Sequence, residues 1–204
     1  MASARPHERE NQGKFSKMNK QAIVLAALIG AASAQVQAQA TEPLYVTVAG
    51  GVSKLNLDCA GTTSCDASDT GLKLVGGYQF GNGLSVELGY LSFGKFRAAD
   101  GQLGITVKPT AITLGGAFAL PLGTDWGFNF RLGLAQVKTK VSAVSGTLTG
   151  NANESKAKTY VGAGITYAVS KTVKLEFGAD ATEAQFAGEK GTLRQFSLGA
   201  TFAF

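Results

Sequence analysis

The feature that most constrains the fold is the strict alternation of side chains over Gln195–Phe204. Successive side chains of an extended chain point to opposite faces, so the apolar residues of this segment share one face: Phe196, Leu198, Ala200, Phe202 and Phe204. The other face carries small or polar side chains. An uncovered apolar strand of this kind pairs with other chains in water. In a bilayer it closes a barrel, with the apolar face toward lipid, so the segment predicts a transmembrane β-barrel.

Alternation of the same period recurs along the chain. It predicts eight strands, over residues 44–57, 70–80, 84–96, 105–120, 126–140, 156–169, 172–186 and 195–204. Three connections are tight, at 81–83, 121–125 and 170–171, and four are longer polar loops, at 58–69, 97–104, 142–155 and 188–191. This asymmetry is typical of outer-membrane barrels, which have short periplasmic turns and longer external loops. We therefore predict an all-β protein, an eight-stranded antiparallel up-and-down transmembrane barrel. A soluble sandwich with core aromatics is the alternative.

Residues 18–40 have the features of a signal peptide. A basic start is followed by an apolar run of about a dozen residues and by the small-x-small site Ala38-Gln39-Ala40. The run is short for a spanning helix, so a membrane anchor is the weaker alternative. Residues 1–17 are polar and without periodicity, which indicates a non-structural extension or a functional tail. Residues 41–204 are then the barrel domain.

Charge and residue usage exclude several classes of function. Beyond residue 40 there are 14 basic and 12 acidic residues, spread along the chain, so no nucleic-acid partner is expected. The only histidine, His7, lies in the extension, so the barrel lacks the usual general base and no enzyme or cofactor is predicted. Cys59 and Cys65 flank a polar loop, and in an exported protein they predict a disulfide. A metal site is the rival interpretation, but two cysteines without histidine do not complete a zinc shell.

The polar face of the strands decides which side is inside. It holds mostly Gly, Ala, Ser and Thr with about one charge per strand, too few for the solvated surface of a soluble lipocalin-type barrel. Its charged residues lie at similar depth: Glu87, Arg131, Lys174 and Glu176, with Lys73 as a further candidate. Unpaired interior charges cost several kcal/mol, so we predict one hydrogen-bonded cluster. It is either a static interior bridge or a polar gate on an ion path.

Several short segments, in this order and spacing, resemble the successive strands of the transmembrane domain of the outer-membrane protein A family. They are residues 76–79, 87–90, 121–125, 131–134, 167–168, 175–177 and 197–199. The resemblance covers nearly all of residues 44–204, and it implies that Glu87, Arg131, Lys174 and Glu176 occupy positions with interior charges in that family. Ala117 and Thr166 depart from the pattern, so one ion pair of the family is expected to be missing.

Together these features favour a monomeric protein of the bacterial outer membrane that supports envelope integrity and presents loops to the outside. A small gated channel and an adhesin are the alternatives. The expected partners are outer-membrane lipid, lipopolysaccharide and the barrel-assembly machinery. That machinery would recognise the apolar residues of the last strand, Phe196, Leu198, Phe202 and Phe204.

Overall fold

The computed structural model describes residues 43–56, 63–101, 103–146 and 148–204. The segments predicted as extension and signal peptide, and Cys59, lie outside these ranges. The described residues form ten strands. Their bounds are β1 Leu44–Leu55, β2 Ser64–Asp66, β3 Ser68–Gln79, β4 Leu84–Ser92, β5 Phe96–Asp100, β6 Leu103–Pro121, β7 Trp126–Ser145, β8 Leu148–Ala168, β9 Val173–Phe186 and β10 Glu189–Ala203. No helix among the described residues is long and apolar enough to cross a bilayer.

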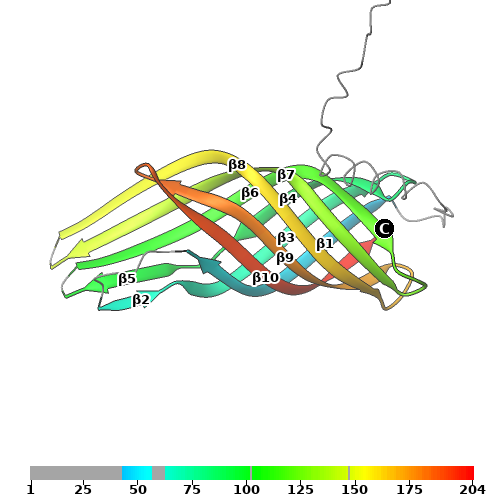
Figure 1. Cartoon of the computed structure of the whole chain (residues 1–204), viewed down its shortest axis with the longest axis horizontal. Helices are drawn as coiled ribbons and strands as arrows, with labels where there is room; N and C mark the ends of the chain where they lie inside the picture. The colour runs from blue at the N-terminus through cyan, green and yellow to red at the C-terminus, as the bar shows by residue number, and fades with distance from the viewer. Residues whose placement is uncertain (1–42, 57–62, 102, 147) are drawn as a thin grey trace, which may run out of the picture. The chain divides into compact units, whose positions relative to one another are not determined.

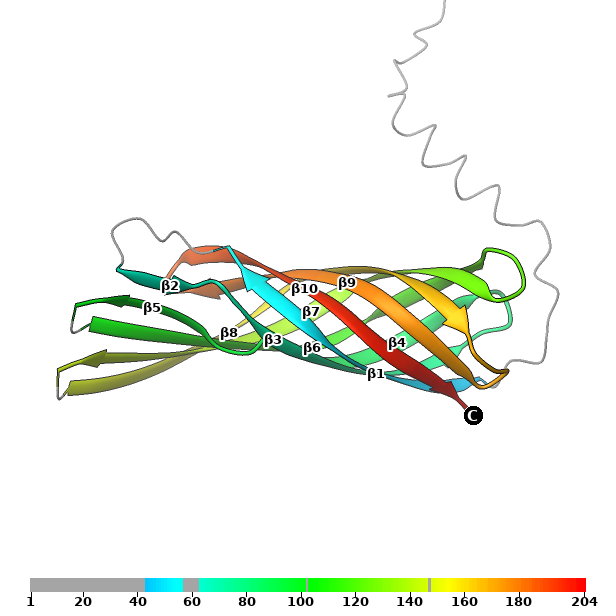
Figure 2. The ribbon, with the colours of Figure 1, turned by 90° about the horizontal axis from the view of Figure 1, so that it is seen from below.

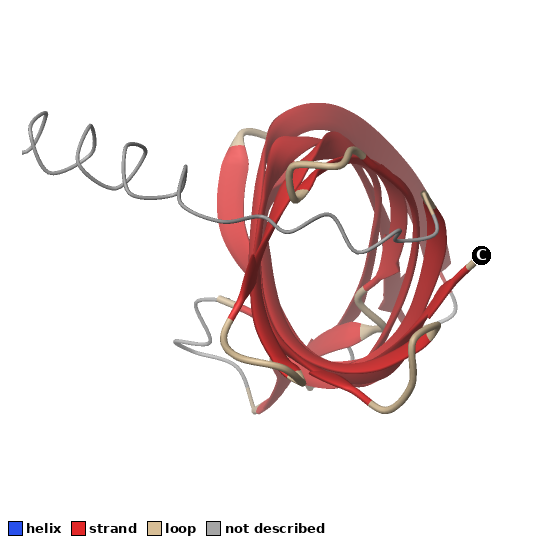
Figure 3. Ribbon diagram, turned by 90° about the vertical axis from the view of Figure 1, so that its right-hand side faces the viewer, coloured by secondary structure: helices blue, strands red, loops and turns tan. Residues whose placement is uncertain are grey.

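Eight of the strands close into a barrel in chain order, β1-β3-β4-β6-β7-β8-β9-β10, and every neighbouring pair is antiparallel. Closure is made by β10 against β1, from Tyr45↔Ala203 to Leu55↔Leu193. Figure 3 shows the resulting ring of strands. The predicted eight-stranded up-and-down barrel is therefore confirmed, and β2 and β5 are additions to it.

The two added strands and the outer parts of β6, β7 and β8 form a sheet that continues beyond the barrel wall. We call it the sheet extension. β2 pairs with β5, β5 with β6 from Phe96↔Val107, and β7 with β8 as far as Ser145↔Leu148. Figures 1 and 2 show these strands reaching past β9 and β10, at the end away from the C-terminus.

The structure corrects all four of the predicted loops. Most of residues 97–104 and 142–155 are strand, and so are residues 189–191 and, within the predicted loop 58–69, residues 64–66 and 68–69. These segments carry polar side chains on both faces, so they lack the apolar alternation that predicts a strand, yet their backbone groups pair with a neighbour. Gly101 and Gly146, both at φ 57°, lie where the two long hairpins turn, in a conformation that favours glycine.

The opposite end of the barrel carries the tight turns, as predicted. Each is closed by a short backbone hydrogen bond, with Phe80 N–H donating to the Leu84 carbonyl at 2.7 Å and Leu122 N–H to the Trp126 carbonyl at 2.8 Å. Aromatic side chains gather there, and the rings of Trp126 and Tyr167 lie 5.0 Å apart on the outer face.

The outer face of the barrel is apolar and the inner face holds the charges. Leu132 and Phe177 are 54% and 57% exposed, whereas Arg131 and Glu176 are each 2% exposed. More than thirty large apolar side chains of the described residues point outward. Leaving one such side chain in water forgoes about 1.5–3 kcal/mol, so this surface requires lipid. The predicted orientation is confirmed.

On each barrel strand, the outward-facing side chains change from apolar to polar at one position toward the sheet extension. The first polar outward-facing residues are Lys54, Thr70, Ser92, Thr110, Gln136, Thr159, Glu183 and Arg194. They mark the edge of the lipid-facing band that is nearest to the sheet extension.

Candidate functional site in the barrel interior

The interior charges lie on inward-facing positions of four strands. Lys73 comes from β3, Glu87 from β4, Arg131 from β7, and Glu176 and Asp180 from β9. All five are at least nine-tenths buried. We call these five residues the charge cluster.

Glycines on β8 and β9 make room for the cluster. A Cβ atom at Gly162 would lie 2.5 Å from Asp180 Oδ1, and one at Gly178 would lie 3.1 Å from Lys73 Nζ. Side chains at these positions would collide with the charged groups, so the glycine-rich inner face is what allows the cluster to fit.

Arg131 is the centre of the cluster. Its Nε donates to Glu87 Oε2 at 2.9 Å, its Nη1 to Glu176 Oε1 at 2.9 Å and its Nη2 to Glu176 Oε2 at 2.8 Å. The planar guanidinium thus holds Glu176 with two parallel bonds, the strongest geometry for such a pair. Asn129, two residues earlier on β7, also donates to Glu176 Oε2 at 2.9 Å.

Lys73 links the two carboxylates of β9, Glu176 and Asp180. Its Nζ lies 3.0 Å from Glu176 Oε1 and 2.9 Å from Asp180 Oδ2. The cluster has one more carboxylate than cation, and two tyrosine hydroxyls donate to the carboxylates. Tyr45 donates to Glu87 Oε1 at 2.6 Å and Tyr160 to Asp180 Oδ1 at 2.5 Å. Every buried carboxylate therefore has partners, as the high cost of an uncompensated interior charge requires.

The sequence prediction is wrong for one member and incomplete for others. Lys174 is half-buried and forms no ion pair with any residue that the structure describes. It lies two residues closer to the tight turns than Glu176, opposite Thr201 of β10. Alternation fixes the face on which a side chain lies but not whether its depth matches a partner. Asp180 was missed, although it lies four residues beyond Glu176 on the same face. Lys73 pairs with Asp180, an ion pair that the sequence analysis did not predict.

Beyond the charge cluster, toward the sheet extension, large apolar side chains pack inside the barrel beside buried threonines such as Thr139 and Thr182. The fully buried apolar side chains include Leu91, Phe93, Phe96 and Leu193, each at most 1% exposed, packed with Leu55, Val137 and Tyr160. We call this group the apolar layer. The prediction of an inner face of mostly small and polar residues is thus incomplete for this half, where large apolar side chains also face inward.

The comparisons with known proteins agree with this architecture. The chain matches the family described as outer membrane protein beta-barrel domain over residues 24–204. The chain belongs to this family. No curated protein sequence matches it. As a member of the outer membrane protein beta-barrel family, the protein lies in the bacterial outer membrane, and the tight-turn end is then periplasmic.

Solved outer-membrane barrels share the fold. Neisserial surface protein A is 14% identical, with 79% of this chain and 97% of that chain covered and a TM-score of 0.55. Ail, the attachment invasion locus protein of Yersinia pestis, is 18% identical, with 78% and 98% covered and a TM-score of 0.51. The N-terminal barrel of Pseudomonas aeruginosa OprF is 15% identical, with 80% and 98% covered and a TM-score of 0.51.

The remaining predicted site residues of this outer-membrane barrel lie at its two ends and on its outer face. Cys65 of β2 is disulfide-bonded, and its predicted pairing with Cys59 stays a prediction because Cys59 lies outside the described residues. The apolar side chains of the last strand are 45–65% exposed on the lipid-facing side: Phe196, Leu198, Phe202 and Phe204. The described residues include no group of three or more His, Cys, Asp or Glu that could hold a metal ion.

Proposed function

We propose that the protein is a structural component of the outer membrane, a monomeric closed barrel that supports envelope integrity and carries the sheet extension on the cell surface. One observation carries this proposal. The charge cluster and the apolar layer fill the interior in succession, so the outer face and the surface sheet are the parts left for function. A barrel of eight strands has an interior that side chains just fill.

The family supports the same assignment at a coarser level, because its members are outer-membrane barrels. The exposed apolar face of β10 supports a further part of the proposal, that the last strand is the signal read by the barrel-assembly machinery. The role in envelope integrity is tested by deleting the gene in its own organism and measuring sensitivity to detergent. We expect greater sensitivity, restored by the full chain. Unchanged sensitivity of the deletion strain would argue against the structural role.

A second candidate function, binding of another surface, is favoured by the tip of the sheet extension. Leu103, Ile105 and Leu148 are exposed there on one face of β6 and β8, and Val144 of β7 is exposed on the other face. Contiguous exposed apolar groups are typical of interaction sites. Ail, whose name describes attachment and invasion, has the same fold, and this supports testing adhesion for the present protein.

The two candidates are separated by shortening one hairpin. Lys140 and Asn153 are opposite each other, so residues 141–152 can be replaced by an Asn-Gly turn without changing the strand register. If the role is structural, the shortened protein restores detergent resistance as well as the full chain does. If the sheet extension binds another cell, the shortened protein restores resistance but loses cell binding.

A further inference from the structure

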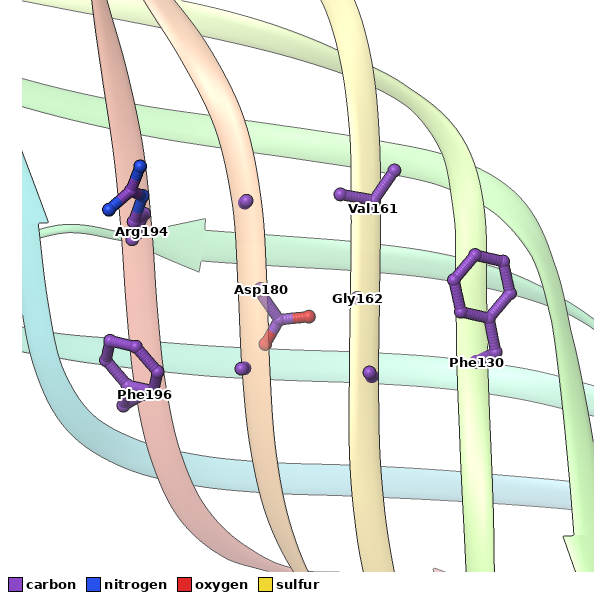
Figure 4. Close-up of a pocket in the computed structure, with 9 residues that line it drawn as sticks. Phe130, Val161, Gly162, Asp180, Arg194 and Phe196 are labelled. Atoms are coloured by element: carbon purple, nitrogen blue, oxygen red, sulfur yellow. The ribbon is translucent and has the colours of Figure 1, made fainter.

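A groove crosses the lipid-facing surface where small residues replace large ones. Phe130 of β7, Ala163 of β8, Ala179 of β9 and Phe196 of β10 are successive partners in one row across four strands. Two phenylalanines thus flank two alanines, and the groove between them has a volume of about 200 Å³. Figure 4 shows Phe130 on one side and Phe196 with Arg194 on the other.

The next row toward the cell surface ends in two cations. It runs from Val161 to Ala181, then to Arg194 of β10 and Lys54 of β1, which are directly opposite each other. Arg194 and Lys54 are the first polar outward residues of their strands, so they lie at the level of lipid headgroups. Both are exposed.

These two cations have no counter-charge within the part of the chain that the structure describes. Neither forms an ion pair with any described residue. The outward acid nearest in register, Glu183, pairs instead with Lys158 at 3.5 Å. Asp180 lines the groove from beneath, but its carboxylate is turned inward to Lys73 and Tyr160. Like charges directly opposite on a sheet destabilise it, so this arrangement favours an external anion.

We propose that the groove and the Arg194–Lys54 pair form a binding site for one phosphorylated glycolipid of the outer leaflet, of the lipid A type. An acyl chain lies between Phe130 and Phe196, and a sugar phosphate is held by the guanidinium and the ammonium. Guanidinium groups match phosphate oxygens with two parallel bonds. The site adds a specific lipid partner to the proposed structural role. The inference rests on that proposed function only for the orientation of the barrel in the membrane.

The test uses the full chain purified in detergent and native mass spectrometry with added lipid. The probes are diphosphorylated lipid A, the same lipid without phosphates, and phosphatidylglycerol. We expect the unmodified barrel to bind one molecule of diphosphorylated lipid A. The double variant Arg194→Gln with Lys54→Gln should bind this lipid at least tenfold more weakly. Ala179→Phe, which fills the groove, should weaken binding to a similar degree.

The matched control is Lys138→Gln with Lys140→Gln, which removes two outward cations of β7 away from the groove. It should leave the affinity unchanged. Heat-modifiable migration on a gel verifies that each variant is folded, and Ala163→Leu replaces Ala179→Phe if the latter does not fold.

Three results would overturn the proposed site. They are an equal loss of lipid A affinity in the control and in the Arg194 and Lys54 variant, binding of the dephosphorylated lipid as tight as that of diphosphorylated lipid A, or binding of phosphatidylglycerol as tight as that of diphosphorylated lipid A. A dimer of this chain that Ala179→Phe dissociates would assign the groove to a second copy instead. None of these results bears on detergent resistance of the deletion strain, so the structural role is judged separately.

Discussion

Replacing Arg131 by methionine removes the central cation of the charge cluster and keeps a side chain of similar length. The guanidinium donates three hydrogen bonds of 2.8–2.9 Å to the carboxylates of Glu87 and Glu176. A hydrogen bond to a charged group contributes roughly 1.5–3 kcal/mol, and part of the sum is offset because methionine does not have to be desolvated as an ion. Removal of one partner of a buried ion pair costs about 3–5 kcal/mol, and we expect a loss in that range.

The free energy of unfolding can be measured by urea titration of the barrel in lipid vesicles. Trp126, the only tryptophan of the chain, lies on the outer face near the tight turns and reports insertion by its fluorescence. Lys138→Met is the matched control, because this exposed lysine makes no ion pair within the described ranges. We expect the control to change the free energy of unfolding by no more than about 0.5 kcal/mol.

A double-mutant cycle identifies the source of the loss. Glu87→Gln removes one carboxylate that Arg131→Met leaves without its cation, so the two substitutions together should cost less than their sum, by about 0.5–3 kcal/mol. The reasoning is refuted if Arg131→Met and Lys138→Met lose the same free energy, or if the losses at residues 131 and 87 simply add.

Three further predictions concern single positions. Gly51→Val should prevent folding, because a Cβ atom there would overlap the backbone of β10, whereas Gly76→Val, with open space around it, should migrate as a folded barrel on a gel. Tyr45→Phe removes the hydroxyl that donates at 2.6 Å to a cluster carboxylate, and it should lower the free energy of unfolding by about 1–3 kcal/mol in the urea titration. The pKa of Asp69, beyond the lipid-facing band, is lowered from 3.8, chiefly because the Lys95 N–H donates to its carboxylate. The stabilising effect of this bond is complete above pH 3.8 and is lost as the pH falls through the lowered pKa, so the NMR shift of the Lys95 amide should titrate below pH 3.8, and Asp69→Asn should abolish that titration.

The sequence predicted the features that depend on alternation. Phe196, Phe202 and their neighbours point to lipid because a period of two leaves no other face, and Arg131 and Glu176 point inward for the same reason. Depth and packing are different, because they depend on how strands are staggered around the barrel. Lys174 lies on the expected face but forms no ion pair with the cluster carboxylates. The strand pairing of residues 142–155 was missed because polar side chains on both faces give no pattern, although backbone pairing does not require one.

The apolar layer escaped prediction for a related reason. Leu91 and Leu193 are inward-facing, yet each is an apolar residue in a strand whose outer face is also apolar, so the sequence alone does not distinguish them from lipid-facing residues. Only closure of the ring brings them together with Phe93 and Phe96.

This second layer determines how the channel alternative should be tested. In an interior closed by the charge cluster alone, Arg131→Ala would open a path for ions. The apolar layer lies in series with the cluster, and an ion that crosses it has to displace its packed side chains. We therefore expect both the unmodified protein and Arg131→Ala to be silent in planar bilayers. Steady conductance should require Arg131→Ala combined with Leu91→Ala and Leu193→Ala.

The control for this experiment is Leu91→Ala with Leu193→Ala and an intact Arg131. It should remain silent, because the cluster of Arg131 with Glu87 and Glu176 still blocks the periplasmic half. Steady conductance of the unmodified protein, or of Arg131→Ala alone, would mean that the apolar layer opens readily and that the channel function deserves preference. Silence of both, with conductance in the combined variant, can arise only if two independent barriers fill the interior.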